Sequence, residues 1–183
     1  MDKGEKKQIN NEKGISADEF KKLMDFAFEA YQKNNTTEQE YRQDGKVPYI
    51  VHSLWCASVF VTDTRIPFEE REKGFKALIL HDVYEDTNLE LPSWVELGVK
   101  EIVKELTFEN SDHALKSAQS KPINIKLLLL VDGLSSMYEE HVEIHRRKRW
   151  KEMMKIATKE VEEHYGNIRI VQLAKAIIAN TDW

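Results

Sequence analysis

The sequence has few of the features that mark secreted, membrane-spanning or sheet-rich proteins. Its 183 residues include one cysteine, seven glycines and four prolines. The single cysteine, Cys56, cannot form an internal disulfide, and its apolar neighbours favour a buried thiol in a reducing compartment. The longest apolar run, Leu127 to Val131, is far too short to span a membrane. The polar N-terminus does not resemble a secretory signal, so we expect a cytoplasmic protein.

The sequence also lacks an excess of basic residues. The formal net charge is -5, with 27 lysines and arginines against 32 acidic residues. Binding to nucleic acid through counterion release requires a broad basic surface, so we expect no nucleic-acid partner. A small anionic ligand remains compatible with this charge, because a few local cations can hold it.

The composition favours a soluble helical protein. Hydrophobic residues make up 41% and charged residues 32% of the chain, while helix-breaking residues are few. We therefore predict an all-α fold, a helical bundle that forms a single domain over residues 15–183. A mobile polar tail is predicted over residues 1–14, because this segment has too little to bury.

Capping and proline signals predict where the helices begin. Ser16 followed by Glu19 fits a capping box, and apolar residues then recur at helical spacing from Phe20 to Tyr31. Further helices should begin near Pro48 and near Pro67, the latter continuing into His81 and Asp82. Three more segments complete the prediction. Leu91–Leu106 is predicted to be an amphipathic helix, the very apolar Ile123–Met137 lies at the centre, and His141–Ile178 is divided at Gly166. The apolar residues of the first of these helices are Trp94, Leu97, Ile102, Val103 and Leu106.

The segment from His81 to Asp86 concentrates one histidine and three acids at the end of an apolar helix. On a continuous helix, His81 and Glu85 lie one turn apart, as do Asp82 and Asp86, so the four side chains can converge. Carboxylates at a helix C-terminus repel one another and oppose the helix dipole, so a cation would compensate them. A solvated helix end with a buried histidine accounts for this segment equally well.

His52 and Asp132 strengthen the case for a metal site. His52 lies beside the apolar stripe of its predicted helix, where a lone histidine is more often a core residue than a ligand. Asp132 directly follows the longest apolar run, in the helix expected to be most buried. An ionised carboxylate in such a position is costly unless it is paired or bound to a metal.

Taken in order, His52, His81-Asp82 and Asp132 resemble the H…HD…D signature of the HD superfamily of all-helical, metal-dependent phosphohydrolases. The stretches 42–52 and 81–87 further resemble the hydrolase domain of the RelA/SpoT family, which removes pyrophosphate from the 3′ position of (p)ppGpp. This resemblance extends from about Ser16 to about Met137.

The resemblance implies a role for each matching residue. One divalent ion, Mn²⁺ foremost and Fe²⁺ or Zn²⁺ as alternatives, would be held by the ligands His52, His81, Asp82 and Asp132. Glu85 and Asp86 would orient and deprotonate the attacking water. Arg42 matches an arginine that contacts the nucleotide, and Lys46 could supply a displaced positive charge.

Three positions depart from the family pattern. The family usually has lysine, arginine and asparagine where this chain has Leu129, Gly133 and Ser136. The implied metal ligands are unaffected by these changes, but residues that contact the substrate in the family are missing. Three functions are therefore compatible with the sequence. The first is a ppGpp 3′-pyrophosphohydrolase, the second a phosphomonoesterase or phosphodiesterase for another nucleotide, and the third an inactive nucleotide-binding regulatory module. A small phosphorylated nucleotide is the expected partner in each case, with no membrane partner, and a homodimer is left open.

The neighbouring serines offer no alternative chemistry in the sequence. Ser135 and Ser136 have no nearby histidine and acid that would activate a serine nucleophile, so we predict that neither acts as one.

Overall fold

A computed structural model describes residues 14–33, 48–108, 113, 116–117, 119–137 and 144–181. Within these ranges the secondary structure is helical, without a strand, and only Pro48 and Thr87 are isolated bridge residues. The predicted all-α fold is therefore confirmed. Of the predicted tail, residues 1–13 lie outside the described part of the chain. No helix in the described ranges has the length and apolar character needed to cross a membrane.

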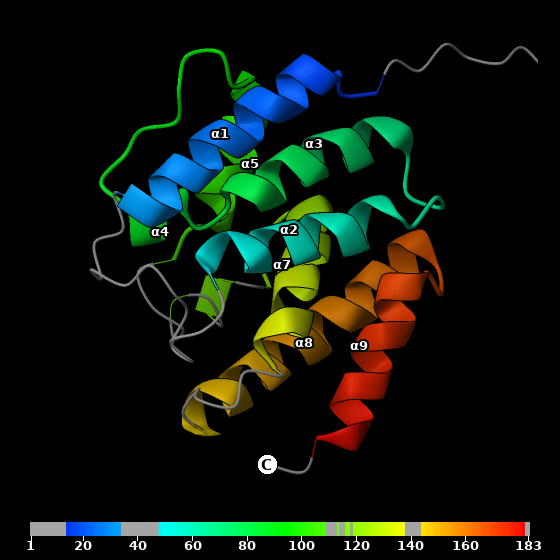
Figure 1. Cartoon of the computed structure of the whole chain (residues 1–183). Coiled ribbons are helices and arrows are strands. Elements are labelled where there is room, and N and C mark those ends of the chain that lie inside the picture. The colour runs from blue at the N-terminus through cyan, green and yellow to red at the C-terminus, as the bar shows by residue number, and fades with distance from the viewer. Residues whose placement is uncertain are drawn as a thin grey trace, which may run out of the picture.

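The helices pack as a bundle around one main core (Figure 1). In chain order they are α1 (Ala17–Lys33), α2 (Tyr49–Val61), α3 (Phe68–Leu80), α4 (Val83–Asp86), α5 (Leu97–Leu106), α7 (Ile123–Ser136), α8 (Ile144–Tyr165) and α9 (Arg169–Asn180). Helix α2 packs mainly against α3, and α7 mainly against α8. Helices α8 and α9 form a hairpin on the side of the bundle away from α1 (Figure 1).

The predicted helix starts are confirmed at the capping serine and at three of the four prolines. The backbone N–H of Glu19 donates to Oγ of Ser16 over 3.1 Å, which is the expected cap of α1. Pro48, Pro67 and Pro122 are the N-cap residues of α2, α3 and α7. Proline suits the start of a helix because the N–H that it lacks would have no partner there.

Helix α7 lies in the centre of the bundle, as its composition predicts. Leu127 to Val131 are each at most 3% exposed. The helix approaches α8 closely at Gly133, where a Cβ atom would lie only 2.9 Å from Cγ of Met154. Lys126, also buried, is bound by Glu160 of α8 and by the carbonyl oxygen of Gln119. A buried ammonium group of this kind is tolerated because it is paired with a carboxylate and bonded to a carbonyl oxygen.

The chain turn between α8 and α9 also follows the prediction. Gly166 has a φ of 76°, in the left-handed region that glycine adopts without steric cost. The next helix is capped from a distant loop, because Oδ2 of Asp63 accepts the backbone N–H of Arg169 over 2.6 Å.

Two helix predictions were wrong at their boundaries. The helix that begins after Pro67 ends at Leu80, and His81 and Asp82 form a turn before the separate α4. The helix predicted from Leu91 begins only at Leu97, because a turn closed by the Val95 N–H and the Pro92 carbonyl oxygen comes first.

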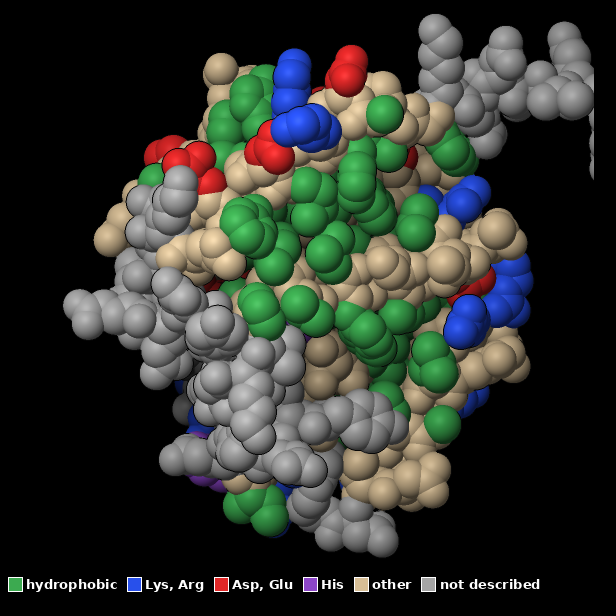
Figure 2. Space-filling view, in the orientation of Figure 1, with side chains coloured by type: hydrophobic (Ala, Val, Ile, Leu, Met, Phe, Trp, Pro, Cys, Tyr) green, Lys and Arg blue, Asp and Glu red, His purple; other side chains and the backbone are tan. Residues whose placement is uncertain are grey.

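The apolar face predicted for this segment is confirmed at its end, where Val103 and Leu106 are buried and Ile102 packs against the core, but was wrong at its start. Trp94 is 45% and Leu97 72% exposed, while Leu91 and Val95 are buried in their place. From Leu91 to Leu97, the turn at Pro92 therefore determines which side chains are buried, and the helical repeat predicted from the sequence does not. Elsewhere, hydrophobic side chains gather on the face formed by α1, α3 and α2 (Figure 2). Phe20 of α1 and Val51 and Trp55 of α2 are exposed hydrophobic residues of these helices.

Candidate metal centre

Three separate parts of the fold bring the predicted ligand side chains together. Helix α2 contributes His52, the turn between α3 and α4 contributes His81 and Asp82, and α7 contributes Asp132. Both imidazoles are buried, with 3% and 5% of their side-chain surface exposed, whereas the two carboxylates keep 20% and 30%. The histidines thus form the floor of the site and the carboxylates its solvent side.

The donor atoms of these four side chains face one another. Nε2 of His52 lies 3.2 Å from Nε2 of His81 and 3.1 Å from Oδ1 of Asp132. Nε2 of His81 lies 3.2 Å from Oδ1 of Asp82 and 3.7 Å from Oδ1 of Asp132. The longest of these distances, 3.8 Å, joins His52 Nε2 to Asp82 Oδ2.

These distances fit a shared metal ion. Two ligand atoms that are each about 2.1 Å from an ion lie roughly 3.0 Å apart at a right angle and roughly 3.4 Å apart at a tetrahedral angle. The separations of 3.1 and 3.2 Å fall within this range, and those of 3.7 and 3.8 Å correspond to wider angles at the ion. Mixed imidazole and carboxylate donors suit a borderline divalent metal such as manganese, iron or zinc.

The outer nitrogen of each imidazole has its own partner. Nδ1 of His81 lies 2.7 Å from the carbonyl oxygen of Leu78, an acceptor that requires a proton on this nitrogen. Nε2 of a neutral His81 is therefore left with a lone pair that faces the other donors. Nδ1 of His52 lies 2.9 Å from Oγ of Ser135 on α7. This contact corrects the prediction that Ser135 has no nearby histidine and acid.

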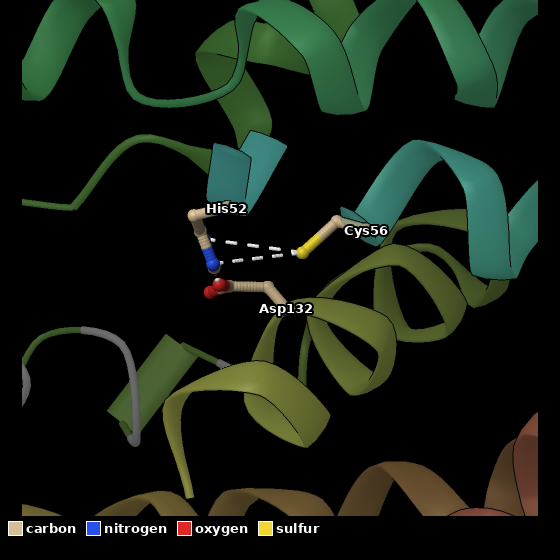
Figure 3. A group of neighbouring side chains, drawn as sticks. All are labelled: His52, Cys56 and Asp132. Atoms are coloured by element: carbon tan, nitrogen blue, oxygen red, sulfur yellow. Dashed lines mark hydrogen bonds and ion pairs between the residues drawn. The ribbon is translucent and has the colours of Figure 1, made fainter. Parts of the chain in front are cut away.

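Cys56 also contacts His52 but does not belong to the ligand set. Figure 3 shows His52, Cys56 and Asp132 together, with Sγ of Cys56 at 3.8 and 3.9 Å from the two ring nitrogens of His52. Being nearly equidistant from both nitrogens, the sulfur lies beside the ring and not along either lone pair. An ion about 2.1 Å beyond Nε2 would be at least roughly 4.5 Å from the sulfur, whereas a zinc–sulfur bond measures about 2.3 Å. Cys56 is buried, as predicted.

A second group of acids, on α1, α3 and the start of α5, already has its cation. Glu19, Glu72 and Glu96 could geometrically hold an ion. Nζ of Lys76 instead lies between them, 2.7, 2.8 and 2.9 Å from their carboxylate oxygens. This cluster is a buried-lysine ion-pair network and not a second metal centre.

The charges of the ligand group perturb its titration. Burial lowers the pKa of His81, but the carboxylates of Asp82 and Asp132 raise it by more, to about 10. Burial also acts to raise the pKa of Asp132, yet its contacts with His52 and His81 bring it well below its usual range. Without a metal, the positive charge at this point is therefore a proton on His81.

Glu85 lies at the edge of the site, where one of its oxygens is held in place. Oε1 accepts the backbone N–H of Phe108 over 2.6 Å. The side chain keeps contact with solvent, but partial loss of hydration and then the charge of Asp82 raise the pKa of Glu85 to about 8. Helix α4, which carries Glu85, is separated from α3 by the turn at His81 and Asp82. The roles predicted for Glu85 and Asp86 remain predictions.

The substrate contacts predicted from the sequence are only partly placed. Arg42 and Lys46 lie outside the described residues. Leu129 and Ser136 are buried, and Gly133 is covered by Met154. None of these three positions on α7 therefore presents a basic group near Asp132.

The contacts of Glu85 with Phe108 and of His52 with Ser135 could not be predicted from the sequence. The partners are 23 and 83 residues apart, and one of them is a backbone N–H. The only available hint was the i, i+3 spacing of Asp132 and Ser135, which places both on the same side of α7.

Comparison with known proteins supports the fold. No protein-family model matches the chain, and no curated protein sequence matches it. A solved structure of a metazoan orthologue of SpoT, described as hydrolysing ppGpp and playing a role in starvation responses, superposes with a TM-score of 0.67. The two chains are 19% identical, and the match covers 90% of this chain and 95% of the other. The chain therefore shares the all-α fold of that SpoT orthologue, the fold that its motifs predicted.

Proposed function

We propose that this chain is a metal-dependent phosphohydrolase and that its reaction removes pyrophosphate from the 3′ position of ppGpp. The observation that carries the proposal is the convergence of two imidazoles and two carboxylates at ligand spacing. It is supported by the likeness in fold to a protein described as hydrolysing ppGpp. The donor atoms account for hydrolase chemistry, and the fold suggests the substrate.

In this proposal His52, His81, Asp82 and Asp132 hold one divalent ion, with Mn²⁺ the first candidate. When bound, such an ion lowers the pKa of a coordinated water and polarises a phosphoryl oxygen. The buried imidazoles keep bulk water away from the inner side of the site, because little of their surface is exposed. The more exposed carboxylates leave the outer side open to a substrate.

Glu85 is the proposed general base. Its pKa, raised to about 8, suits proton transfer near neutral pH. The Phe108 N–H holds Oε1, so Oε2 is the oxygen left to accept a proton from the attacking water. Attack at the phosphorus next to the ribose breaks its bond to the 3′ oxygen, which departs with a proton, and pyrophosphate is released. Asp86 is proposed to help orient the water, and Arg42 with Lys46 to neutralise phosphate charge.

A second candidate function is hydrolysis of another phosphorylated nucleotide. It is favoured by the uncharged α7 residues Leu129, Gly133 and Ser136, which provide no cation for a second phosphate group. Fewer cations near Asp132 would suit a substrate with less charge.

Product analysis distinguishes these functions. The manganese-loaded protein is incubated with ppGpp and with a panel of other nucleotides, alongside the variants Asp132→Asn and Glu101→Gln, the latter removing an exposed acid on α5. Pyrophosphate and GDP from ppGpp, lost in Asp132→Asn and kept in Glu101→Gln, are the expected result. Inorganic phosphate from another nucleotide would favour the second candidate. Nucleotide binding without turnover by the metal-loaded protein would contradict the enzyme proposal and favour a regulatory module.

A further inference from the structure

The two histidines of the site differ in what holds their outer nitrogen. For His81 the partner is the Leu78 carbonyl oxygen, which can only accept, so the proton on Nδ1 is fixed. For His52 the partner is the Ser135 hydroxyl, which can either donate or accept. The hydrogen-bonding state of His52 is therefore decided by one side chain on another helix.

We propose that Ser135 is a positioning residue that makes His52 competent to bind metal, an inference that rests on the metal site of the proposed function. When Nδ1–H of His52 donates a hydrogen bond to the Ser135 hydroxyl, Nε2 has a lone pair that faces His81 and Asp132. With the opposite arrangement, Nε2 carries the proton and cannot be a ligand. Partners of this kind fix the tautomer and orientation of metal-binding histidines.

The position of Ser135 on α7 places it beside the proposed ligand Asp132. Asp132 and Ser135 are three residues apart on one helix and so lie on one side of it. The same helix thereby presents a carboxylate to Nε2 of His52 and a hydroxyl to Nδ1, at 3.1 and 2.9 Å. Cys56, the other neighbour of the ring, cannot replace Ser135, because a thiol is a weak hydrogen-bond partner and its sulfur is 3.8 Å from Nδ1.

The contacts also form a chain from Ser135 through His52 to Asp132, which resembles the order of a serine-nucleophile triad. Two observations oppose that role. Nε2 of His52 faces a second imidazole at 3.2 Å, and Asp132 is shared with His81 at 3.7 Å. A base that serves one serine needs neither contact, whereas a ligand around an ion needs both.

The test compares three single substitutions in the full chain. Ser135→Ala removes the hydroxyl, and Ser135→Thr retains one. Ser53→Ala is the matched control, because Ser53 is next to His52, is 1% exposed, and its hydroxyl forms no hydrogen bond with His52 in the described structure. Manganese affinity is measured by calorimetry, and the tautomer of His52 in the zinc-loaded protein by long-range ¹H–¹⁵N correlation spectroscopy.

We expect Ser135→Ala to weaken manganese binding roughly 10- to 100-fold. Ser135→Thr should recover most of the affinity, and Ser53→Ala should stay within about twofold of the unsubstituted protein. The zinc-loaded protein should show His52 protonated at Nδ1, and Ser135→Ala should lose this single tautomer.

Three results would overturn the proposal. They are unchanged affinity and tautomer in Ser135→Ala, an equal loss of affinity in Ser53→Ala, and covalent labelling of Ser135 by a fluorophosphonate. Because these readouts concern metal binding and protonation, they remain decisive even if the metal-loaded protein does not hydrolyse ppGpp. Failure of the proposed reaction is thereby separated from failure of the role of Ser135.

Discussion

Among the single residues of the site, His81 carries a proton where the proposed metal ion would bind. Asp82 and Asp132 raise the pKa of His81 to about 10 against the opposing effect of burial. The imidazole is therefore protonated at neutral pH in the metal-free protein, where its charge balances the two carboxylates. The same negative charge that attracts a proton attracts a divalent cation, so the two compete for one place.

This competition predicts that metal binding releases a proton. Below the raised pKa of about 10, His81 must lose its proton before Nε2 can bind an ion. We expect about one proton to be released per manganese ion at pH 7.5, and manganese affinity to rise up to about tenfold per pH unit below pH 10. Calorimetry in two buffers with different ionisation enthalpies measures the number of protons. Binding with no proton release, and with affinity independent of pH, would contradict this account of His81.

A substitution at Glu85 separates base catalysis from metal binding. In Glu85→Gln, the amide oxygen can still accept the Phe108 N–H, but the side chain can no longer take a proton. Turnover should fall roughly 10²- to 10⁴-fold, which is the usual contribution of a general base. Manganese affinity should change little, because Glu85 is not one of the four proposed ligands. A variant with unaltered turnover would exclude Glu85 as the base.

The side chains that meet at this site were predictable from the sequence, but the hydrogen-bond partners of His52 and Glu85 were not. Histidines and aspartates in a characteristic order predicted which side chains meet, and the structure brings His52, His81, Asp82 and Asp132 together. The hydroxyl of Ser135 and the N–H of Phe108 could not be assigned, because such partners depend on how distant segments pack.

At the scale of elements, close packing of α3 depends on a glycine. A Cβ atom at Gly74 would lie 2.3 and 2.7 Å from ring atoms of Phe60, which is 2% exposed. Gly98 of α5 is the opposite case, with nothing within 4 Å of the added atom.

Alanine substitutions at these two glycines should therefore have opposite effects on stability. Overpacking at Gly74→Ala costs about 1–3 kcal/mol, more than the gain in helix propensity of up to about 1 kcal/mol. We expect Gly74→Ala to lower the free energy of unfolding and Gly98→Ala to raise it slightly. Chemical denaturation followed by circular dichroism tests both. Equal effects at the two positions would contradict the packing of α3 against α2.

Helix starts were predictable from local chemistry, and the interruptions were not. The capping serine and the prolines predicted the starts of α1, α2, α3 and α7 correctly, because these signals act within one turn. The end of α3 at Leu80 has no comparable signal, since the residues from His81 to Asp86 are compatible with a continuous helix. The turn before α5 was missed because its apolar residues also fit a helical repeat.

At the scale of the whole molecule, the proposed ligands are distributed so that only the folded chain can assemble them. They come from α2, from the turn between α3 and α4, and from α7. An unfolded chain offers the same groups without the arrangement, so an ion should bind the native state preferentially.

Manganese should therefore stabilise the fold. At a free concentration of one hundred times the dissociation constant, the expected stabilisation is about 2.7 kcal/mol. Thermal unfolding with and without manganese measures it, with magnesium as a comparison ion that prefers oxygen ligands. Asp132→Asn should lose most of the shift, whereas Glu101→Gln should retain it. A shift that survives Asp132→Asn would locate the ion elsewhere in the molecule.

The most direct test of the central claim is to locate the ion in crystals grown with manganese, by anomalous scattering. We predict one strong anomalous peak within about 2.0–2.3 Å of Nε2 of His52, Nε2 of His81 and carboxylate oxygens of Asp82 and Asp132. No peak among these four side chains, or one bound by Glu19, Glu72 and Glu96 in place of Lys76, would contradict the metal centre and the hydrolase proposal built on it.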